Sequence, residues 1–281
     1  AIVPTAPERV RNRDSEYLYR FDSYFYYLCG FQEPEAVLVL VAGAEAQSIL
    51  FCREKNPERE TWDGFRYGPE AAREAFGVDV AFPIGQLGEK LPARMANQPA
   101  LHYAPGMDPL WDERIMGWLN QVRAQNRTGI SAPQRICDVR AALDEMRLIK
   151  DGHELALMRR AAAISAKAHE RAMRATRPGR MEYEIEAELL YEFRRHGAQF
   201  PAYWPIVAGG ANACVLHYSD NNARLADGAL LLIDAGCELD GYASDITRTF
   251  PVNGKFGGPQ KDVYELVLAA QAAAIGATRP G

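Results

Sequence analysis

The sequence predicts a mixed α/β protein, of the α+β kind, with two domains. The chain has 281 residues, of which 48% are hydrophobic, enough to bury the cores of one large or two ordinary domains. Apolar runs of strand length occur in both halves, and Ala-rich helical segments dominate the second half. A polar, turn-forming stretch at 124–133 separates the two halves, and we place the domain boundary after residue 142.

Charge and hydropathy exclude several classes of protein. The 32 Lys and Arg residues are outnumbered by 37 Asp and Glu, and no basic run occurs, so no nucleic-acid partner is expected. The longest apolar stretch, 36–44, is far shorter than the roughly 20 residues that cross a bilayer. The first residues lack the pattern of a signal peptide, and five scattered cysteines favour reduced thiols. We therefore expect a cytoplasmic protein with no membrane partner.

The first domain, 1–142, is expected to be rich in strands. Its strands are short apolar runs separated by a Gly-containing turn, and one of its helices begins at Gly68-Pro69 and ends at Gly77. Two strands and two helices are predicted, at 36–41, 47–52, 70–75 and 111–123.

The second domain, 143–281, begins with a long helix. Asp151 and Glu154 have the spacing of a capping box, and an Ala-rich stretch follows to about residue 175. Two more helices are predicted, at 182–196 and 261–275. Strands are predicted at 206–208, 213–218, 229–234 and 241–250.

A short repeat marks the ends of two of these helices. The pentapeptide Ala-Thr-Arg-Pro-Gly occurs at 175–179 and again at 277–281. Because both copies follow an Ala-rich helix, they indicate a duplicated unit. We therefore expect a pseudo-symmetric domain, of which this chain holds the first half and is incomplete at its C-terminus.

Two aspartates flank a predicted hairpin. Asp240-Gly241 is a strong turn signal. A four-residue loop places Asp234 and Asp245 directly opposite each other, whereas a two-residue loop places them diagonally on the same face. Either register brings two like charges together, which a cation or a shared proton must offset. Oxygen ligands of this kind favour Mn, Mg, Co or Zn over soft metals. The alternative is that one aspartate simply stays in water beside the turn.

The segment around this hairpin resembles a known family. Residues 212–256, which contain LLLIDAGCELDGYASDITRTF, look like the metal-site region of the Xaa-Pro aminopeptidases (aminopeptidase P) of the pita-bread metallopeptidase family. The likeness extends through 145–150 and 194–198, and 14–40 resembles the N-terminal domain of these enzymes. It implies a creatinase/prolidase-like N-terminal domain followed by the first half of a pita-bread metallopeptidase domain.

The resemblance implies a hydrolase with two Mn ions, with Co or Zn as alternatives, that removes the N-terminal residue from peptides with proline second. By motif position, Asp234 ligates one ion and Asp245 bridges both. His217 matches a histidine beside the substrate and carries the catalytic role. Tyr203 matches a tyrosine near the metals, and Trp62 matches a tryptophan that reaches a neighbouring subunit's active site, so the resemblance implies that both bind the substrate. The contact of Trp62 with another subunit implies a homo-oligomer.

Each of these residues has a plainer interpretation. His217 lies in an apolar run and would ordinarily belong to the core, and Tyr203 and Trp62 would ordinarily be packing residues. The remaining histidines are assigned to surface or helix-end positions: His102, His153, His169 and His196.

The sequence departs from the family pattern after Asp245. No histidine follows, and the only later glutamate is Glu265, so the expected His and two Glu ligands are absent from this chain. Two carboxylates bind a transition metal weakly. We therefore expect the chain alone to be inactive, with the missing ligands supplied by a C-terminal fragment of the same protein or by residues beyond this chain. Prolidase activity and a non-catalytic pita-bread binding module remain alternatives. Creatinase chemistry is disfavoured, because it needs no metal.

Overall fold

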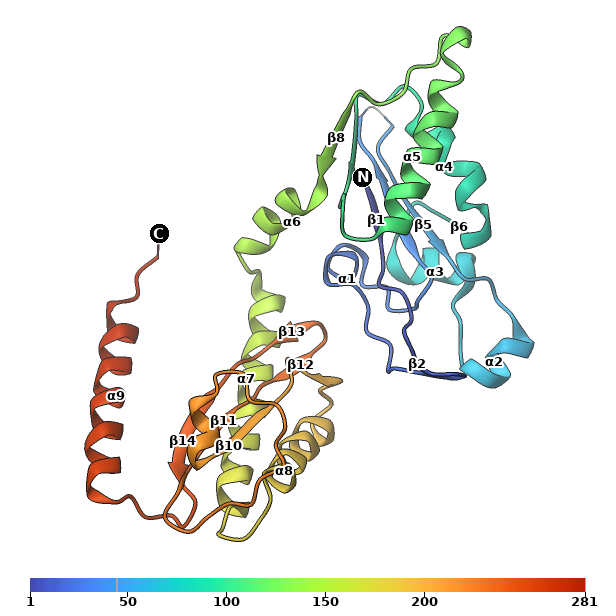
Figure 1. Cartoon of the computed structure of the whole chain (residues 1–281). Helices are drawn as coiled ribbons and strands as arrows, with labels where there is room; N and C mark the ends of the chain where they lie inside the picture. Colours follow the sequence, from blue (N-terminus) through green and yellow to red (C-terminus); the bar gives the residue numbers. More distant parts are fainter. Residues whose placement is uncertain (44, 281) are drawn as a thin grey trace. The chain divides into compact units, whose positions relative to one another are not determined.

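The computed structural model describes residues 1–43 and 45–280. The chain forms two compact units, Ala1–Ile149 and Lys150–Gly281 (Figure 1). The sequence-based boundary after residue 142 differs from this division because helix α6 (Val139–Leu148) belongs to the first unit. Its Val139 and Leu143 pack into an apolar cluster of that unit. The predicted α/β class is confirmed.

The first unit is built on a four-stranded sheet with the order β1-β4-β5-β6. Strands β1 (Ile2–Pro4), β4 (Val37–Val41) and β5 (Gln47–Cys52) are antiparallel, and β6 (Val80–Pro83) runs parallel to β5. The two apolar runs that predict β4 and β5 are thus confirmed as buried strands.

Helices cover both faces of this sheet. Alternate residues of β4 and β5, such as Val37 and Phe51, pack with α4 (Leu87–Met95) and α5 (Pro109–Arg123). The intervening residues, such as Leu38, pack with α1 (Ser23–Cys29) and α3 (Gly68–Phe76). Side chains alternate between the faces of a strand, so both faces of the two apolar runs are buried.

The remaining elements of the first unit lie outside this sheet. They are the short hairpin β2 (Val10–Asn12) and β3 (Ser15–Glu16), helix α2 (Pro57–Asp63), and the parallel pair β7 (Ala100–Tyr103) and β8 (Arg135–Asp138).

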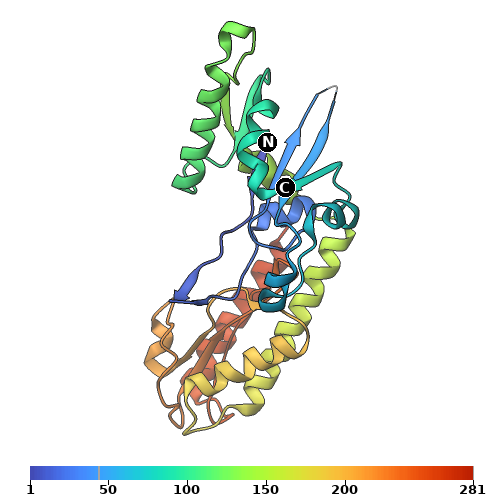
Figure 2. The same cartoon turned by 90° about the vertical axis from the view of Figure 1, so that its right-hand side faces the viewer.

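The second unit packs two helices against two small sheets. Helices α7 (Gly152–Ala175) and α8 (Glu182–Arg195) lie side by side (Figures 1 and 2). One sheet has the order β10-β11-β14, with strands Ile206–Gly209, Leu230–Asp234 and Thr247–Pro251. The other has the order β13-β12-β9, with strands Tyr242–Ala243, Cys237–Leu239 and Phe200–Pro201.

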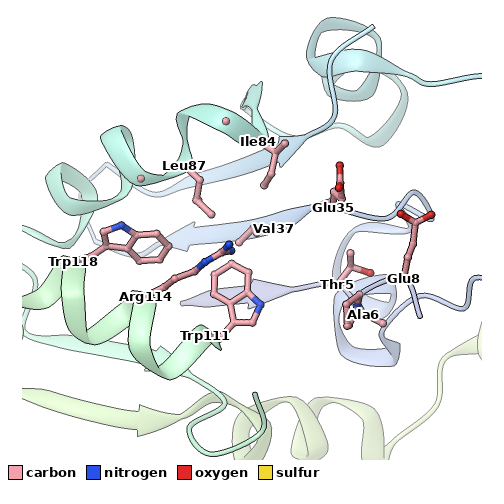
Figure 3. Close-up of a pocket in the computed structure, with 14 residues that line it drawn as sticks. Thr5, Ala6, Glu8, Glu35, Val37, Ile84, Leu87, Trp111, Arg114 and Trp118 are labelled. Carbon is pink, nitrogen blue, oxygen red and sulfur yellow. The ribbon is translucent and has the colours of Figure 1, made fainter. Parts of the chain in front are cut away.

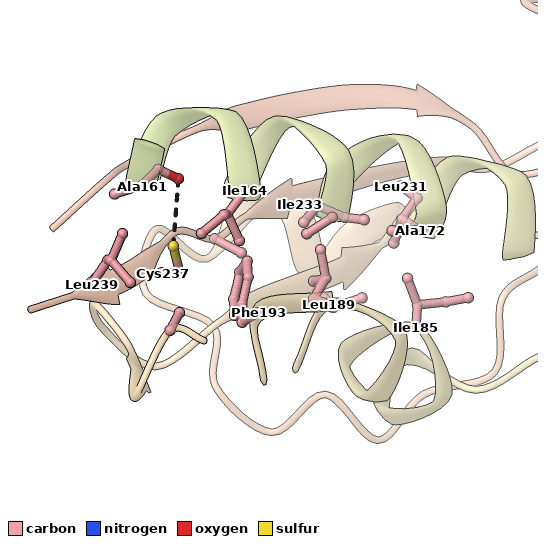
Figure 4. Packing of buried hydrophobic residues seen from close by; sticks show 14 of the residues in the cluster. Ala161, Ile164, Ala172, Ile185, Leu189, Phe193, Leu231, Ile233, Cys237 and Leu239 are labelled. Carbon is pink, nitrogen blue, oxygen red and sulfur yellow. Dashed lines mark hydrogen bonds between the residues drawn. The ribbon is translucent and has the colours of Figure 1, made fainter. Parts of the chain in front are cut away.

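One apolar cluster joins these layers (Figure 4). Ile164 comes from α7, Leu189 and Phe193 from α8, and Ile233 and Leu239 from the strands, and all are buried. Helix α7 therefore lies directly against the strands that carry the predicted site.

The helix ends follow the local sequence signals. Helix α7 begins with the predicted capping box, in which Asp151 accepts from the Glu154 amide and Glu154 from the Asp151 amide, each at 2.8 Å. The repeated pentapeptide gives the same exit twice: the hydroxyls of Thr176 and Thr278 each donate to the carbonyl group four residues earlier.

Helix α9 (Gly258–Ala277) contains the predicted segment 261–275 and has no buried residue. Within residues 1–43 and 45–280, no helix is both long enough and apolar enough to span a membrane. All five cysteines have free thiols.

Candidate metal centre

The hairpin that carries the two aspartates has a two-residue turn. Leu239 pairs with Tyr242, and Asp240 and Gly241 between them have φ values of 48° and 78°. Both turn residues are left-handed, as the tight hairpin turn favoured by Asp-Gly requires. The same register continues into β11 and β14, where Asp234 pairs with Thr247. The two-residue register is therefore confirmed, and the directly opposed arrangement of a four-residue loop is wrong.

In this register the two carboxylates meet at one hydroxyl group. The Tyr203 hydroxyl lies 2.5 Å from Oδ1 of Asp234 and 3.0 Å from Oδ1 of Asp245. A phenol has a single proton, so it donates fully to only one of two ionised carboxylates. Burial and the hydrogen bonds to both aspartates raise the pKa of Tyr203 strongly. The hydroxyl is thus held protonated between two anions, an arrangement that a cation would stabilise.

Gly236 allows the two strands to approach closely between these aspartates. A Cβ atom on Gly236 would lie 1.7 Å from the carbonyl oxygen of Ser244. No side chain fits at that distance, so the close approach requires glycine. Backbone hydrogen bonds fix it on both sides, from Ala235 to Ile246 at 3.1 Å and from Ser244 to Cys237 at 3.0 Å.

Helix α7 supports this crossing with two buried polar side chains. Ser165 accepts from the Cys237 amide at 2.9 Å and contacts the Ser244 hydroxyl at 2.7 Å. One turn later, Nε2 of His169 lies 3.0 Å from the carbonyl oxygen of Ala235, so it is the protonated ring nitrogen. Burial lowers the pKa of His169, which favours the neutral ring.

The assignment of His169 to a surface or helix-end position is therefore wrong. It is 3% exposed and lies within α7, directly behind the strand that carries Asp234. Sequence reasoning missed both Ser165 and His169 as supports of the site. Their four-residue spacing on the face of α7 that also carries Ala161, Ile164 and Ala172 is the signal that identifies them.

His217 lies on an exposed turn and not in a strand. The predicted strand 213–218 is wrong: Gly210–Cys214 form a short 3-10 helix, η3, and a turn follows. The side chains that would face a core are also exposed, with Leu216 at 88%. The segment does not form a strand because the buried Glu182 binds the Gly209 amide and the Asn212 and Tyr218 side chains.

The two remaining predicted residues, Tyr203 and Trp62, lie in different units. Tyr203 follows β9 and meets both aspartates, and its neighbour Trp204 is 63% exposed. Trp62 lies in α2 of the first unit and is 80% exposed, so it is not a packing residue within that unit.

The oxygen atoms near the hairpin suit a hard divalent cation as ligands, but they do not complete its coordination. Asp234, Asp245 and Tyr203 offer oxygen atoms, which Mn²⁺ and Mg²⁺ prefer. Among the residues that the structure describes, no three His, Cys, Asp or Glu side chains lie close enough together to hold a metal ion.

The first unit contains a separate cavity of about 680 Å³ (Figure 3). Trp111, Arg114 and Trp118 of α5 line one side, and Glu8 and Glu35 lie at one end. None of the predicted site residues is among its described lining residues.

Two family models match the chain. Residues 1–102 match "Aminopeptidase P, N-terminal domain", and residues 156–281 match "Metallopeptidase family M24". The Xaa-Pro aminopeptidase of Haemophilus influenzae is 47% identical over 98% of this chain and 61% of its own length. That of Escherichia coli is 44% identical over the whole chain and 64% of its own length.

Solved structures give the same result. The aminopeptidase PepP of Pseudomonas aeruginosa superposes with a TM-score of 0.97 at 51% identity, over 100% of this chain and 64% of that one. A zinc-substituted Escherichia coli aminopeptidase P in complex with product gives a TM-score of 0.97 at 44% identity, with the same coverage. The chain thus spans about three fifths of the length of the curated relatives it matches.

Proposed function

The chain belongs to metallopeptidase family M24, with an aminopeptidase P N-terminal domain ahead of it, and on this premise we propose that it takes part in metal-dependent release of the N-terminal residue from peptides with proline second. The observation that carries the proposal is the convergence of Asp234 and Asp245 on the hydroxyl of Tyr203. The names of the Haemophilus influenzae and Escherichia coli relatives support the reaction class.

Asp234 and Asp245 are the proposed metal ligands of this chain. Both carboxylates would bind the metal, with Mn²⁺ as the preferred ion and Co²⁺ or Zn²⁺ as alternatives. Bound divalent ions lower the pKa of a coordinated water and polarise a carbonyl group, so they supply the chemistry of peptide hydrolysis at neutral pH. Two carboxylates do not complete such a site, and we propose that further ligands come from outside these 281 residues.

Three residues have proposed roles toward the peptide. Tyr203 binds the substrate beside the proposed metal ligands, as the contacts of its hydroxyl group with both carboxylates support. His217 binds the substrate and stabilises the charge that develops on the scissile carbonyl, as its exposed position on a turn permits. Trp62 reaches the site of a neighbouring subunit in a homo-oligomer, which its 80% exposure supports.

Hydrolysis assays on the complete gene product test this proposal. After removal of metal with a chelator, we expect no hydrolysis of an Ala-Pro-Ala tripeptide, and recovery of hydrolysis on addition of Mn²⁺. Replacing Asp245 by Ala removes one of the two proposed ligands and is expected to abolish the Mn²⁺-dependent rate. A rate that survives in the Asp245→Ala protein contradicts its assignment as a ligand.

The length of the substrate separates the proposed activity from its alternatives. An Xaa-Pro aminopeptidase cleaves Ala-Pro-Ala, whereas a prolidase acts on the dipeptide Ala-Pro. Turnover of the dipeptide alone replaces our proposal with prolidase activity. Absence of both reactions, with Mn²⁺ bound, leaves a non-catalytic binding module.

We place the protein in the cytoplasm, and its five free thiols support a reducing compartment.

A further inference from the structure

One buried carboxylate organises the segment that carries His217. Glu182 is the first residue of α8 and is 0% exposed. Its Oε1 accepts hydrogen bonds from the Gly209 amide at 2.7 Å and the Asn212 side chain at 3.0 Å. Its Oε2 accepts from the Tyr218 hydroxyl at 2.8 Å and the Ala223 amide at 2.9 Å. These four donors span the segment 209–223 from its first residue to its last.

The surroundings of Glu182 are shaped for this contact. A Cβ atom on Gly209 would lie 3.3 Å from Oε1 of Glu182 and 2.8 Å from the Leu225 side chain, so glycine permits the close approach. Among the described residues, Glu182 forms no ion pair. Its charge is instead compensated by the four donors and by its position in the first turn of α8.

This compensation constrains the segment. A carboxylate buried without its hydrogen bonds is strongly unfavourable, so the loss of any of the four donors destabilises the folded state. Between Asn212 and Tyr218 the apolar side chains are not packed into the core, since Val215 and Leu216 are 56% and 88% exposed. The conformation of the turn at His217 therefore depends on Glu182 and not on packing of the turn itself.

A second buried carboxylate of α8 ties the same segment to the strand beside Tyr203. Asn221 is 1% exposed and left-handed, with a φ of 45°. It donates to Glu186 at 2.9 Å and to the Pro205 carbonyl at 2.8 Å, and it accepts from the Val207 amide at 3.0 Å. The segment and the start of β10, which follows Tyr203 closely in the chain, are thus held by one helix.

We propose that Glu182 is a positioning residue, which fixes the 209–223 segment so that His217 is held at one place relative to the two aspartates. This inference rests on the proposed function. Glu182 acts only through His217, because its own oxygens are fully buried and occupied by the segment's donors.

Glu182→Gln is the decisive variant. A glutamine keeps the shape but has a single acceptor oxygen, so its NH₂ group faces a pair of donors and at least one backbone amide loses its partner. We expect amide hydrogen exchange of at least one of Gly209 and Ala223 to become at least about 10-fold faster. With the complete Mn²⁺-loaded protein we expect kcat for Ala-Pro-Ala to fall at least about 10-fold, with Mn²⁺ affinity unchanged.

A double-mutant cycle separates positioning from general stability. If Glu182 acts through His217, then His217→Ala lowers kcat much less in the Glu182→Gln background than in the wild type. The proposal is overturned if the two substitutions lower kcat independently, so that their fold-changes multiply in the double variant. It is also overturned if amide hydrogen exchange at Gly209 and Ala223 is unchanged in Glu182→Gln. Glu192→Gln is the matched control, because Glu192 is a buried carboxylate of α8 that pairs with Arg171 and Arg195 instead of the segment. We expect it to leave kcat within about 2-fold of wild type.

A milder variant covers the case in which Glu182→Gln does not fold. Tyr218→Phe removes one of the four donors and leaves the carboxylate with three. We expect a smaller change in the same direction, with the same non-additivity toward His217→Ala, and additivity there overturns the proposal equally. The exchange measurement needs no substrate, so it still tests the role of Glu182 if Xaa-Pro peptides are not hydrolysed.

Discussion

Asp234 and Asp245 both lie within hydrogen-bond distance of the single hydroxyl group of Tyr203. Because two carboxylates that lie close together repel each other, Asp245→Asn is expected to stabilise the metal-free protein by about 0.5 kcal/mol. The same variant is expected to lose the increase in melting temperature that Mn²⁺ gives the wild type, since a ligand that binds only the folded state stabilises it. Thermal unfolding of the complete gene product, with chelator and with Mn²⁺, measures both effects.

Asp240→Asn is the control for this comparison. It makes the same chemical change on the same hairpin, and asparagine tolerates the left-handed conformation of that turn residue. We expect the Asp240→Asn protein to respond to Mn²⁺ as the wild type does. An Asp245→Asn protein that is still stabilised by Mn²⁺ shows that the ion binds elsewhere.

His169 makes the stability of the second unit depend on pH. Burial lowers its pKa in the folded protein, Arg248 lowers it further, and Asp234 and the Ala235 carbonyl oppose the shift. The unfolded chain then binds more protons than the folded one below about pH 6.5, the ordinary histidine value. The free energy of unfolding therefore decreases as pH falls from about 6.5 toward the lowered pKa of His169. Above about pH 6.5 this contribution to stability is fully retained.

Urea unfolding between pH 5 and 8 measures this contribution. His169→Gln keeps a donor for the Ala235 carbonyl but does not titrate, so we expect a flatter dependence on pH in that range. His153→Gln serves as the control, because His153 is exposed in the first turn of α7. A pH profile of His169→Gln that matches the wild type rules out His169 as the titrating group.

Local sequence signals predicted the elements that local interactions determine. The capping box of Asp151 and Glu154, the Asp240-Gly241 turn and the apolar runs of β4 and β5 each form where expected, because the residues that decide them are neighbours in the chain or alternate along one strand. The diagonal placement of Asp234 and Asp245 followed from the same turn.

The errors share a physical cause, which is a distant partner. The apolar run at 213–218 resembles a strand, but Glu182 binds the chain on both sides of it, at Gly209 and Ala223, and holds it as a 3-10 helix and a turn. The sequence alone predicts a surface or helix-end position for His169, because nothing nearby in sequence indicates the Ala235 carbonyl. A buried polar group is understood only with its partner, and neither partner is visible from spacing alone.

The capping box at the start of α7 should contribute measurably to stability. Asp151→Ala removes the side chain that accepts from the Glu154 amide, and we expect a loss of about 1 kcal/mol in the free energy of unfolding. Asp151→Ser retains an acceptor and is expected to lose only a few tenths of that amount. Urea unfolding followed by circular dichroism compares the two, and equal losses contradict a role for the cap.

Gly236 is expected to be the least replaceable glycine of the hairpin. In Gly236→Ala the new methyl group meets the Ser244 carbonyl at 1.7 Å, and backbone atoms cannot turn aside as a flexible side chain can. The strands must separate where the hydrogen bonds of Ala235 and Ser244 hold them, so we expect a loss of about 3 kcal/mol or more. Because separation also moves Asp234 away from Asp245, Mn²⁺ should no longer raise the melting temperature of the variant.

Gly276→Ala provides the contrast, since a Cβ there meets no atom within 4 Å and lies in a helix, where alanine is preferred. A Gly236→Ala protein as stable as Gly276→Ala means that the backbone crossing is wider in solution than the structure shows.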